Sequence, residues 1–184
     1  MLQAALVSKQ EELVQIYDLN KQNLRQNLPE DEKEKEGFVS WLYSLELLQK
    51  MHELAPSVIV TDDAHVVGYA LTTAKESSAF HNDLKVMMDN LQNLEYKGKS
   101  LTAHNAYFMG QICIAKEYRG KGLVDLLYKK HKEVYSKRFD ILITEISTSN
   151  VRSQKAHEKI GFKTIHTYKD AMDEWNVVVW DWRE

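Results

Sequence analysis

The sequence has little cysteine and proline: Cys113 is its one cysteine, and Pro29 and Pro56 are its two prolines. A single cysteine excludes an intramolecular disulfide and suits a reducing compartment. No apolar run approaches the roughly 18 residues of a membrane-spanning helix, and no charged and then apolar leader stands at the N-terminus. These absences predict a cytoplasmic protein with no membrane partner.

Neither sign of charge dominates the chain. The 24 lysines and arginines and 27 aspartates and glutamates give a formal net charge of −3, so no bulk attraction to nucleic acid is expected. The seven histidines lack the spacings of common zinc sites, so no metal site is predicted. With 184 residues, 43% of them hydrophobic, the chain is long enough for one packed domain and short for two.

The most informative segment runs from Ile112 to Tyr128. An apolar β-branched stretch is followed by a charged turn, by the loop 119–122 (Arg-Gly-Lys-Gly), and then by apolar residues at helical spacing. Glycines let the backbone curl around a ligand, and the first turn of a helix offers free N–H groups. Neither the dinucleotide pattern nor the nucleotide-triphosphatase pattern is complete. The segment therefore predicts a phosphate or pyrophosphate site of another kind.

A second segment downstream repeats the order of strand, turn and helix. After a strand pattern over residues 140–146 comes Asn150, which suits a helix N-cap, and then Gly161, which suits a left-handed C-cap. Phe162 begins the next strand. A merely well-capped helix explains Asn150 and Gly161, but it does not explain the whole pattern at this distance from the glycine loop.

Over about residues 107–168 the two segments resemble the shared motifs of the GCN5-related N-acetyltransferase (GNAT) family. The loop beginning at Arg119 is similar to that family's acyl-CoA pyrophosphate pattern, Q/R-x-x-G-x-G/A, although Val124 stands where the pattern has a small residue. Asn150 and Ser153, with the later Glu-Lys and Gly-Phe pairs, match the last shared motif. His157 occupies the position at which the family commonly has a tyrosine.

The resemblance implies an acyltransferase that moves an acetyl group from acetyl-CoA, its co-substrate, to a primary amine by direct attack. The acceptor would be a small-molecule or peptidic amine, and a homodimer is compatible with this function. Acetyl-CoA would lie between two splayed central parallel strands. The expected contacts to it are Ile112, Cys113, Ile114, Arg119, Gly120, Lys121, Gly122, Leu123, Val124, Asn150 and Ser153.

The apolar patterns predict a single α/β domain over residues 1–184, and the resemblance implies a mixed, mostly antiparallel sheet with helices on both faces. Residues 29–36 are expected to be a solvated connector, and residues 74–105 a substrate-side insertion. Strands are expected over 2–7, 57–61, 66–73, 107–115, 140–146, 163–168 and 175–182. Helices are expected from a capping box of Ser8 and Glu11, over 38–54 and 80–94, and after Gly122 and Asn150.

Acetyl transfer requires a neutral amine, a stabilised oxyanion and a proton for the departing thiolate. His157 is the candidate acid, because an imidazole can donate a proton near neutral pH; packing on the ligand is the alternative. Glu145 is a candidate base, since burial would raise its pKa. The alternative is that its carboxylate faces outward into solvent. Gln111, or a base that acts through a water molecule, is then the other candidate for the general base. Cys113 is expected to be a small core residue rather than a nucleophile.

Two other functions stay open: a non-catalytic acyl-CoA-binding module, and another phosphate-binding or nucleotide-binding α/β domain. The acceptor is expected to be cationic, because acidic side chains near the cleft would attract an amine; an acidic solvated surface is the alternative explanation for them. These side chains are Asp170, Asp173 and Glu174 in the last turn, and Glu76, Asp83 and Asp89 in the insertion.

Overall fold

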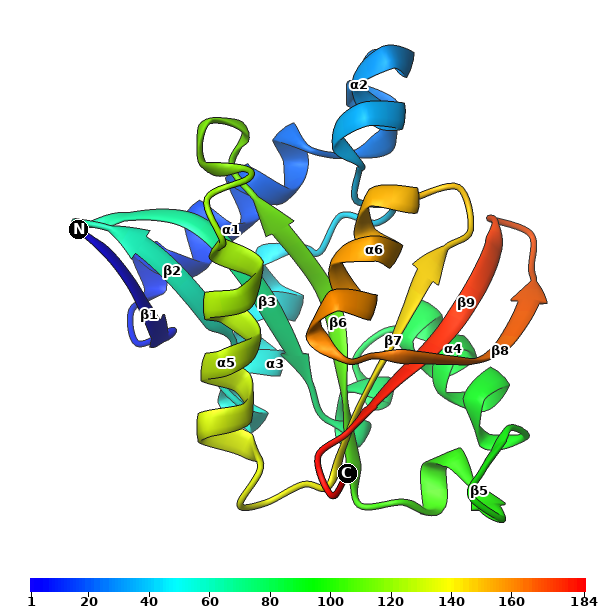
Figure 1. Ribbon diagram of the computed structural model, residues 1–184. Coiled ribbons are helices and arrows are strands. Elements are labelled where there is room, and N and C mark those ends of the chain that lie inside the picture. The colour runs from blue at the N-terminus through cyan, green and yellow to red at the C-terminus, as the bar shows by residue number, and fades with distance from the viewer.

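The computed structural model describes residues 1–184, the side chain of Glu34 excepted, and is built around a seven-stranded sheet (Figure 1). Its strands are β1 (Leu2–Leu6), β2 (Val58–Asp62), β3 (His65–Thr73), β6 (Ala106–Ile114), β7 (Ile141–Ser147), β8 (Lys163–Lys169) and β9 (Glu174–Asp181). The helices are α1 (Gln10–Gln22), α2 (Glu30–Glu36), α3 (Leu45–Leu54), α4 (Asn82–Gln92), α5 (Leu123–Tyr135) and α6 (Val151–Ile160). The strands β4 (Glu95–Tyr96) and β5 (Lys99–Ser100) pair separately.

The sheet contains one parallel pair at its centre. The strand order is β1-β2-β3-β6-β7-β9-β8, and β6 with β7 is the parallel pair among otherwise antiparallel ones. Their pairing covers Ala106–Phe108 against Ile141–Ile143, and beyond it the two strands diverge (Figure 1). At the start of the gap, the Thr144 hydroxyl donates to the Met109 carbonyl over 2.8 Å. The central strands are therefore splayed, as the resemblance implied.

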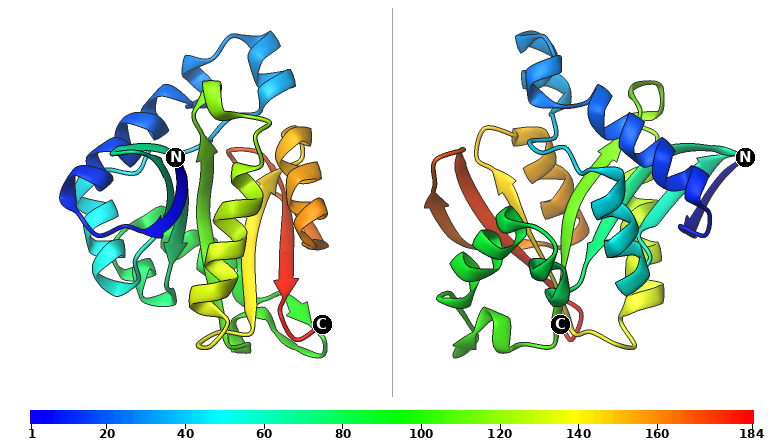
Figure 2. Two further views of the ribbon diagram at one scale, coloured as in Figure 1. Left: turned by 60° about the vertical axis from the view of Figure 1, so that its left-hand side comes forward. Right: turned by 180° about the vertical axis from the view of Figure 1, so that it is seen from behind.

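Helices cover both faces of the sheet (Figure 2). Helices α1, α3 and α4 lie on one face, and α5 and α6 lie on the other. The apolar stripe of α5 packs its buried Leu123, Leu127 and Tyr128 against the sheet. Each such side chain contributes roughly 1.5–3 kcal/mol through burial. This packing fixes the position of the first turn of α5 at the end of β6.

The segment before α3 differs from the sequence-based prediction. The helix expected over residues 38–54 begins only at Leu45, because the Ser44 hydroxyl caps it by accepting from the backbone N–H of Leu47. Residues 38–43 are largely extended instead, and the side chain of Asn20 binds them through Tyr43 N and Trp41 O. This extended segment reaches the gap between the central strands.

Two further expectations were wrong in detail. Residues 29–36 form helix α2 rather than a solvated connector, since Pro29 precedes it and acidic residues occupy its first turn, where they favour the helix dipole. The capping box of α1 uses Glu12 rather than Glu11: its carboxylate accepts from Ser8 N over 2.7 Å and from Lys9 N over 3.0 Å.

The stretch between β3 and β6 contains α4, as expected, and the β4–β5 hairpin, which was not predicted. Leu84, Leu91 and Leu101 are buried in this stretch, and Leu91 and Leu101 pack with Phe108 of β6. Helix α4 therefore borders the gap between the central strands on the side opposite α5 and α6.

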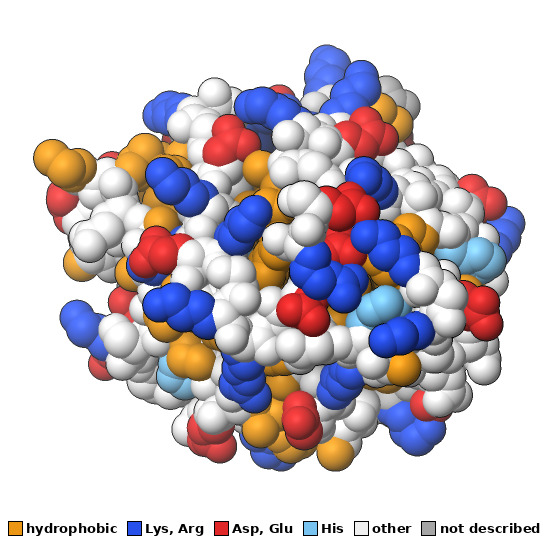
Figure 3. All heavy atoms as spheres, turned by 60° about the horizontal axis from the view of Figure 1, so that its bottom comes forward, with side chains coloured by type: hydrophobic (Ala, Val, Ile, Leu, Met, Phe, Trp, Pro, Cys, Tyr) orange, Lys and Arg blue, Asp and Glu red, His pale blue; other side chains and the backbone are white. Residues whose placement is uncertain are grey.

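The face of the molecule turned forward in Figure 3 is mixed in charge. On the face turned forward in Figure 3, lysine and arginine side chains are interspersed with aspartate and glutamate side chains, so this face carries no strong field of one sign. Among the described residues, none of the helices combines the length and the apolar composition needed to cross a bilayer.

Candidate functional site

Two neighbouring cavities lie where β6 and β7 separate. The glycine-loop cavity, about 290 Å³, lies between the loop 118–122 and α6. The Glu145 cavity, about 220 Å³, lies between β7, α4 and the turn after β8. The residues that line both cavities are Phe38, Val39, Ile112, Asn150, Ser153 and His157.

Backbone groups dominate the glycine-loop cavity. Gly120 and Gly122 have φ angles of +75° and +78°, a left-handed conformation that other residues rarely adopt. Gly122 is the N-cap of α5, so the first free N–H groups of that helix follow it directly. A Cβ atom added at either glycine would meet no atom within 4 Å. The loop is therefore open to a ligand, and its amides and helix terminus suit a pyrophosphate.

Several side chains predicted at this cavity are used by the fold itself. Leu123 and Cys113 are buried, and burial raises the pKa of the Cys113 thiol to about 12, so the thiol stays protonated. Asn150 caps α6 as predicted, accepting from Ser153 N over 3.2 Å, and also donates to Phe38 O over 3.0 Å. The side chains of these residues therefore stabilise the walls of the cavity.

The two cations of the loop differ in accessibility. The Arg119 side chain is 11% exposed and donates to Asn23 Oδ1 over 2.5 Å and to Ile114 O over 3.2 Å. Lys121 is exposed, and its ammonium group lies 4.9 Å from the centre of the Tyr118 ring. Arg119 thus holds the loop against α1 and β6, whereas Lys121 remains accessible to a ligand.

His157 is buried in a hydrogen-bonded arrangement. Its Nδ1 lies 2.7 Å from the Ser153 carbonyl oxygen and its Nε2 lies 2.5 Å from the Tyr128 hydroxyl. Because a carbonyl oxygen only accepts, we assign the proton to Nδ1, and Nε2 then accepts from Tyr128. Burial lowers the pKa of His157 to about 4, so the ring is neutral at pH 7. Both ring nitrogens are therefore engaged.

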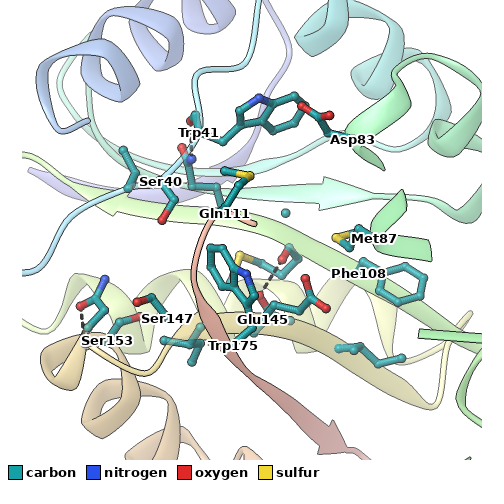
Figure 4. Close-up of a pocket in the computed structure, with 18 of the residues that line it drawn as sticks. Ser40, Trp41, Asp83, Met87, Phe108, Gln111, Glu145, Ser147, Ser153 and Trp175 are labelled. Carbon is teal, nitrogen blue, oxygen red and sulfur yellow. Dashed lines mark hydrogen bonds between the residues drawn. The ribbon is translucent and has the colours of Figure 1, made fainter. Parts of the chain in front are cut away.

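Glu145 lies in the second cavity, not on the outer face of the sheet (Figure 4). The Tyr168 hydroxyl donates to its Oε1 over 2.8 Å. Burial raises the pKa of Glu145 to about 7, and the nearby Asp170 carboxylate acts in the same direction, while the Tyr168 bond opposes them. The result is a carboxylate poised to exchange a proton near neutral pH.

The remaining walls of the Glu145 cavity are largely apolar and aromatic. Figure 4 shows Trp41 and Asp83 on one side and Glu145 and Trp175 on the other. Gln111 fixes the extended segment, because its Nε2 donates to Trp41 O over 2.8 Å and its Oε1 accepts from Tyr69. Both ends of the Gln111 amide are thus hydrogen-bonded, and an amide nitrogen is not basic. Of the two candidates for the base on β6 and β7, this leaves Glu145.

Four of the acidic residues expected near the cleft divide into two groups. Asp83 and Asp170 line the Glu145 cavity. Asp173 instead binds Arg25 over 2.9 Å, and Asp89 pairs with a lysine on α4. No group of three or more histidine, cysteine or acidic side chains is placed to hold a metal ion in the described part of the chain. The acidic character of the cavity therefore rests on Asp83, Glu145 and Asp170.

Sequence reasoning missed the partners of the candidate residues. Tyr128 binds His157 from α5, Tyr168 binds Glu145 from β8, and Tyr43 lies near Glu145 from the segment before α3. Each partner is at least 23 residues away from its contact along the chain. No local pattern marks these tyrosines, because their role depends on which strands and helices become neighbours.

The sequence of this chain matches the profile of an acetyltransferase family, and its fold is similar to that of known acetyltransferases. The profile of the acetyltransferase (GNAT) family matches residues 13–162. The fold is similar to the ribosomal-protein-S18-alanine N-acetyltransferase from Escherichia coli, with a TM-score of 0.66 and 12% identity over 98% of this chain and 94% of that one. It is also similar to Ard1 from Thermoplasma volcanium, with a TM-score of 0.67 and 10% identity over 98% and 97% of the two chains.

A third similar structure is Arabidopsis thaliana NAA60 in complex with acetyl-CoA. Its TM-score is 0.65 at 11% identity, over 98% of this chain and 99% of that one. No curated protein matches the sequence of this chain. At these identities the structural likeness establishes the fold, and the match to the family profile establishes the relationship.

The bond between His157 and Tyr128 predicts a specific pattern of stabilities. His157→Leu should cost roughly 1–3 kcal/mol in unfolding free energy, because it leaves the buried Tyr128 hydroxyl without a partner. Adding Tyr128→Phe should recover part of that loss, since both polar groups are then gone. Urea unfolding of both single variants and the double variant measures this coupling. Strictly additive losses would show that the bond contributes nothing.

Proposed function

This chain belongs to the GNAT family of acetyltransferases, with acetyl-CoA as its co-substrate, and we propose that it transfers the acetyl group to a primary amine by direct attack. The observation that supports this most strongly is Glu145, a carboxylate with a pKa of about 7 in a cavity beside the glycine-loop cavity. The two cavities offer separate places for donor and acceptor, and they share walls at the point where the central strands separate.

The glycine-loop cavity is the proposed site for acetyl-CoA. The N–H groups that follow Gly122 would bind the pyrophosphate, with Lys121 adding a positive charge. The pantetheine arm contains amides, and the edge of β6 over Ile112–Ile114 faces the gap beyond its pairing with β7. Unpaired strand edges readily bind another extended chain of amides. The thioester would then lie at the junction of the cavities.

The Glu145 cavity is the proposed site for the acceptor. Glu145 accepts a proton from the ammonium form of the amine, so that the neutral nitrogen can form a bond to the thioester carbonyl carbon as the carbon–sulfur bond breaks. A backbone N–H near Ile112 or Ile114 donates to the carbonyl oxygen as charge develops on it. The amine releases a second proton, and the departing thiolate takes up a proton to give CoA.

His157 fits a positioning role better than the role of acid. Its ring is neutral, Nδ1 already donates to Ser153 and Nε2 accepts from Tyr128. If this ring protonated the thiolate, it would have to be resupplied with a proton by the Tyr128 hydroxyl. Burial raises the pKa of that hydroxyl well above its usual range, so it is a poor proton donor. We therefore propose that His157 shapes the wall shared by the cavities and that the thiolate takes its proton from the amine or from water.

The shape and charge of the acceptor cavity support a cationic amine. Aromatic side chains such as Trp41 and Trp175 provide apolar contact area, and Asp83 and Asp170 add negative charge beside Glu145. This combination favours a small molecule or peptide that carries a primary amine and further positive charge. A non-catalytic acyl-CoA-binding module is the second candidate, since a residue other than tyrosine stands at position 157.

An amine panel tests the proposed function directly. Incubation with acetyl-CoA and spermidine, a lysine-containing peptide or glutamate should release CoA thiol fastest with the cationic amines, and added salt should reduce their advantage.

Glu145→Gln should lower the rate by roughly 10²–10⁴ while CoA still binds. Binding of CoA without release by any amine would favour the non-catalytic module.

The pH dependence tests the role of Glu145. The base must be ionised, so kcat/KM should rise with pH and reach half its maximum near pH 7. Tyr168→Phe removes a hydrogen bond that favours the ionised form, so the pKa of Glu145 should rise and the profile should move to higher pH. Tyr43→Phe is the matched control, since its hydroxyl is not hydrogen-bonded to Glu145 among the described contacts. Identical profiles for wild type and Tyr168→Phe would exclude Glu145 as the titrating base.

The glycine loop provides a test of the acetyl-CoA site. Gly122→Asp should abolish the stabilisation of the fold by CoA, because it places a carboxylate among amides that would face phosphate. Gly122→Asn is the matched control: asparagine has the same size, tolerates the left-handed conformation and lacks the charge. Thermal shift with CoA compares the two variants. Equal responses would show that the phosphates bind elsewhere.

A further inference from the structure

Two carboxylates of α2 face the glycine loop. Glu32 and Glu36 are four residues apart, so they lie on the same side of the helix. Glu32 pairs with Lys116 over 2.9 Å, and its Oε1 lies 3.6 Å from Arg119 Nη1. Glu36 Oε2 lies 3.5 Å from the same Nη1 atom. That Nη1 atom is buried and has no hydrogen-bond partner among the described residues.

Glu36 also binds a cation on the opposite wall of the cavity. Arg152, in the first turn of α6, donates to Glu36 Oε2 over 2.5 Å and to Lys35 O over 3.1 Å. Both Glu36 and Arg152 line the glycine-loop cavity, and the Arg152 side chain is 40% exposed. Helix α2 therefore connects the loop before α5 with the start of α6, and Figure 1 shows it above both.

The placement of these carboxylates opposes the charge of the cavity. The N-terminus of α5 and Arg152 supply positive charge at its walls, and so does Lys159, which pairs with Asp125 over 3.3 Å. Glu36 neutralises part of this charge at a place where an anionic ligand would need it. Because the Glu36–Arg152 pair is partly exposed, it contributes little to folding stability, and its main effect is on the potential inside the cavity.

We propose that Glu36 sets the affinity of the glycine-loop cavity for CoA by pairing with Arg152, a cation that the phosphates of CoA would otherwise bind. Without CoA, the Glu36 carboxylate binds Arg152 and lies near Arg119. When CoA binds, Arg152 turns from Glu36 to a phosphate, so part of the binding energy is used to break that pair. The carboxylate thereby weakens binding and speeds the release of CoA. This inference rests on the proposed location of the pyrophosphate.

Calorimetry with CoA and pantetheine tests the inference. Glu36→Gln should tighten CoA binding about 3- to 5-fold at low ionic strength, the range expected for a partly exposed ion pair, and less at high salt. Pantetheine lacks phosphates, so its affinity should not change. Glu30→Gln is the matched control, because Glu30 lies on the same helix and pairs with Lys33, away from the cavity.

A double-mutant cycle identifies the cation involved. Arg152→Gln should weaken CoA binding, and Glu36→Gln should then have no further effect. Weaker CoA binding by Glu36→Gln, or an equal gain for pantetheine, would overturn the inference and assign Glu36 a structural or steric role. If Gly122→Asp and Arg152→Gln both leave CoA affinity unchanged, the proposed location of the pyrophosphate itself is wrong.

Discussion

The early end of the pairing between β6 and β7 is the constraint on which the site depends. Parallel strands normally continue their hydrogen bonds along their common length, but these two stay paired only over Ala106–Phe108 and Ile141–Ile143. The Thr144 hydroxyl satisfies the Met109 carbonyl where the ladder stops. Beyond it, the open edges form walls rather than a sheet interior. Glu145 and Ile112 reach their cavities because they lie on these diverging lengths.

Burial acts on the two titratable groups at this opening in opposite ways. Both Glu145 and His157 lose contact with water, and in both cases burial disfavours the charged form. For the carboxylate this raises the pKa to about 7, into the range in which it can exchange protons with an amine. For the imidazole it lowers the pKa to about 4, so the ring stays neutral and serves as a hydrogen-bonding wall. One physical effect thus moves the pKa values of the two groups in opposite directions.

Charge is distributed unevenly between the two cavities. The Glu145 cavity contains carboxylates from α4, β7 and the turn after β8, without a cation among its lining residues in the described structure. The glycine-loop cavity is lined by three cations, Arg119, Arg152 and Lys159, and by the two carboxylates Asp125 and Glu36. Such a division of charge suits an enzyme that binds one anionic and one cationic substrate, because each substrate is then attracted to its own cavity. The ion pairs of α2 place negative charge at the edge of the glycine-loop cavity.

The sequence by itself determined the features that depend on neighbouring residues. Gly122 begins α5, Asn150 caps α6 and Gly161 ends it in a left-handed conformation, all as predicted, because caps and tight turns are decided within a few residues. The strand patterns around Ile112 and Ile143 likewise predicted two strands, and the resemblance to the family implied that these are the central parallel pair.

The tertiary structure decided the rest. Residues 30–36 are all charged in the sequence, and their contacts with Arg119 and Arg152 form only when distant segments of the chain meet in the fold. The expected helix over 38–54 was shortened because Ser44 caps it and Asn20 binds the extended part. The pKa values of Glu145 and His157 depend on walls built from several helices and strands. Burial and through-space hydrogen bonds are properties of the packed chain, so no local pattern of residues could have specified them.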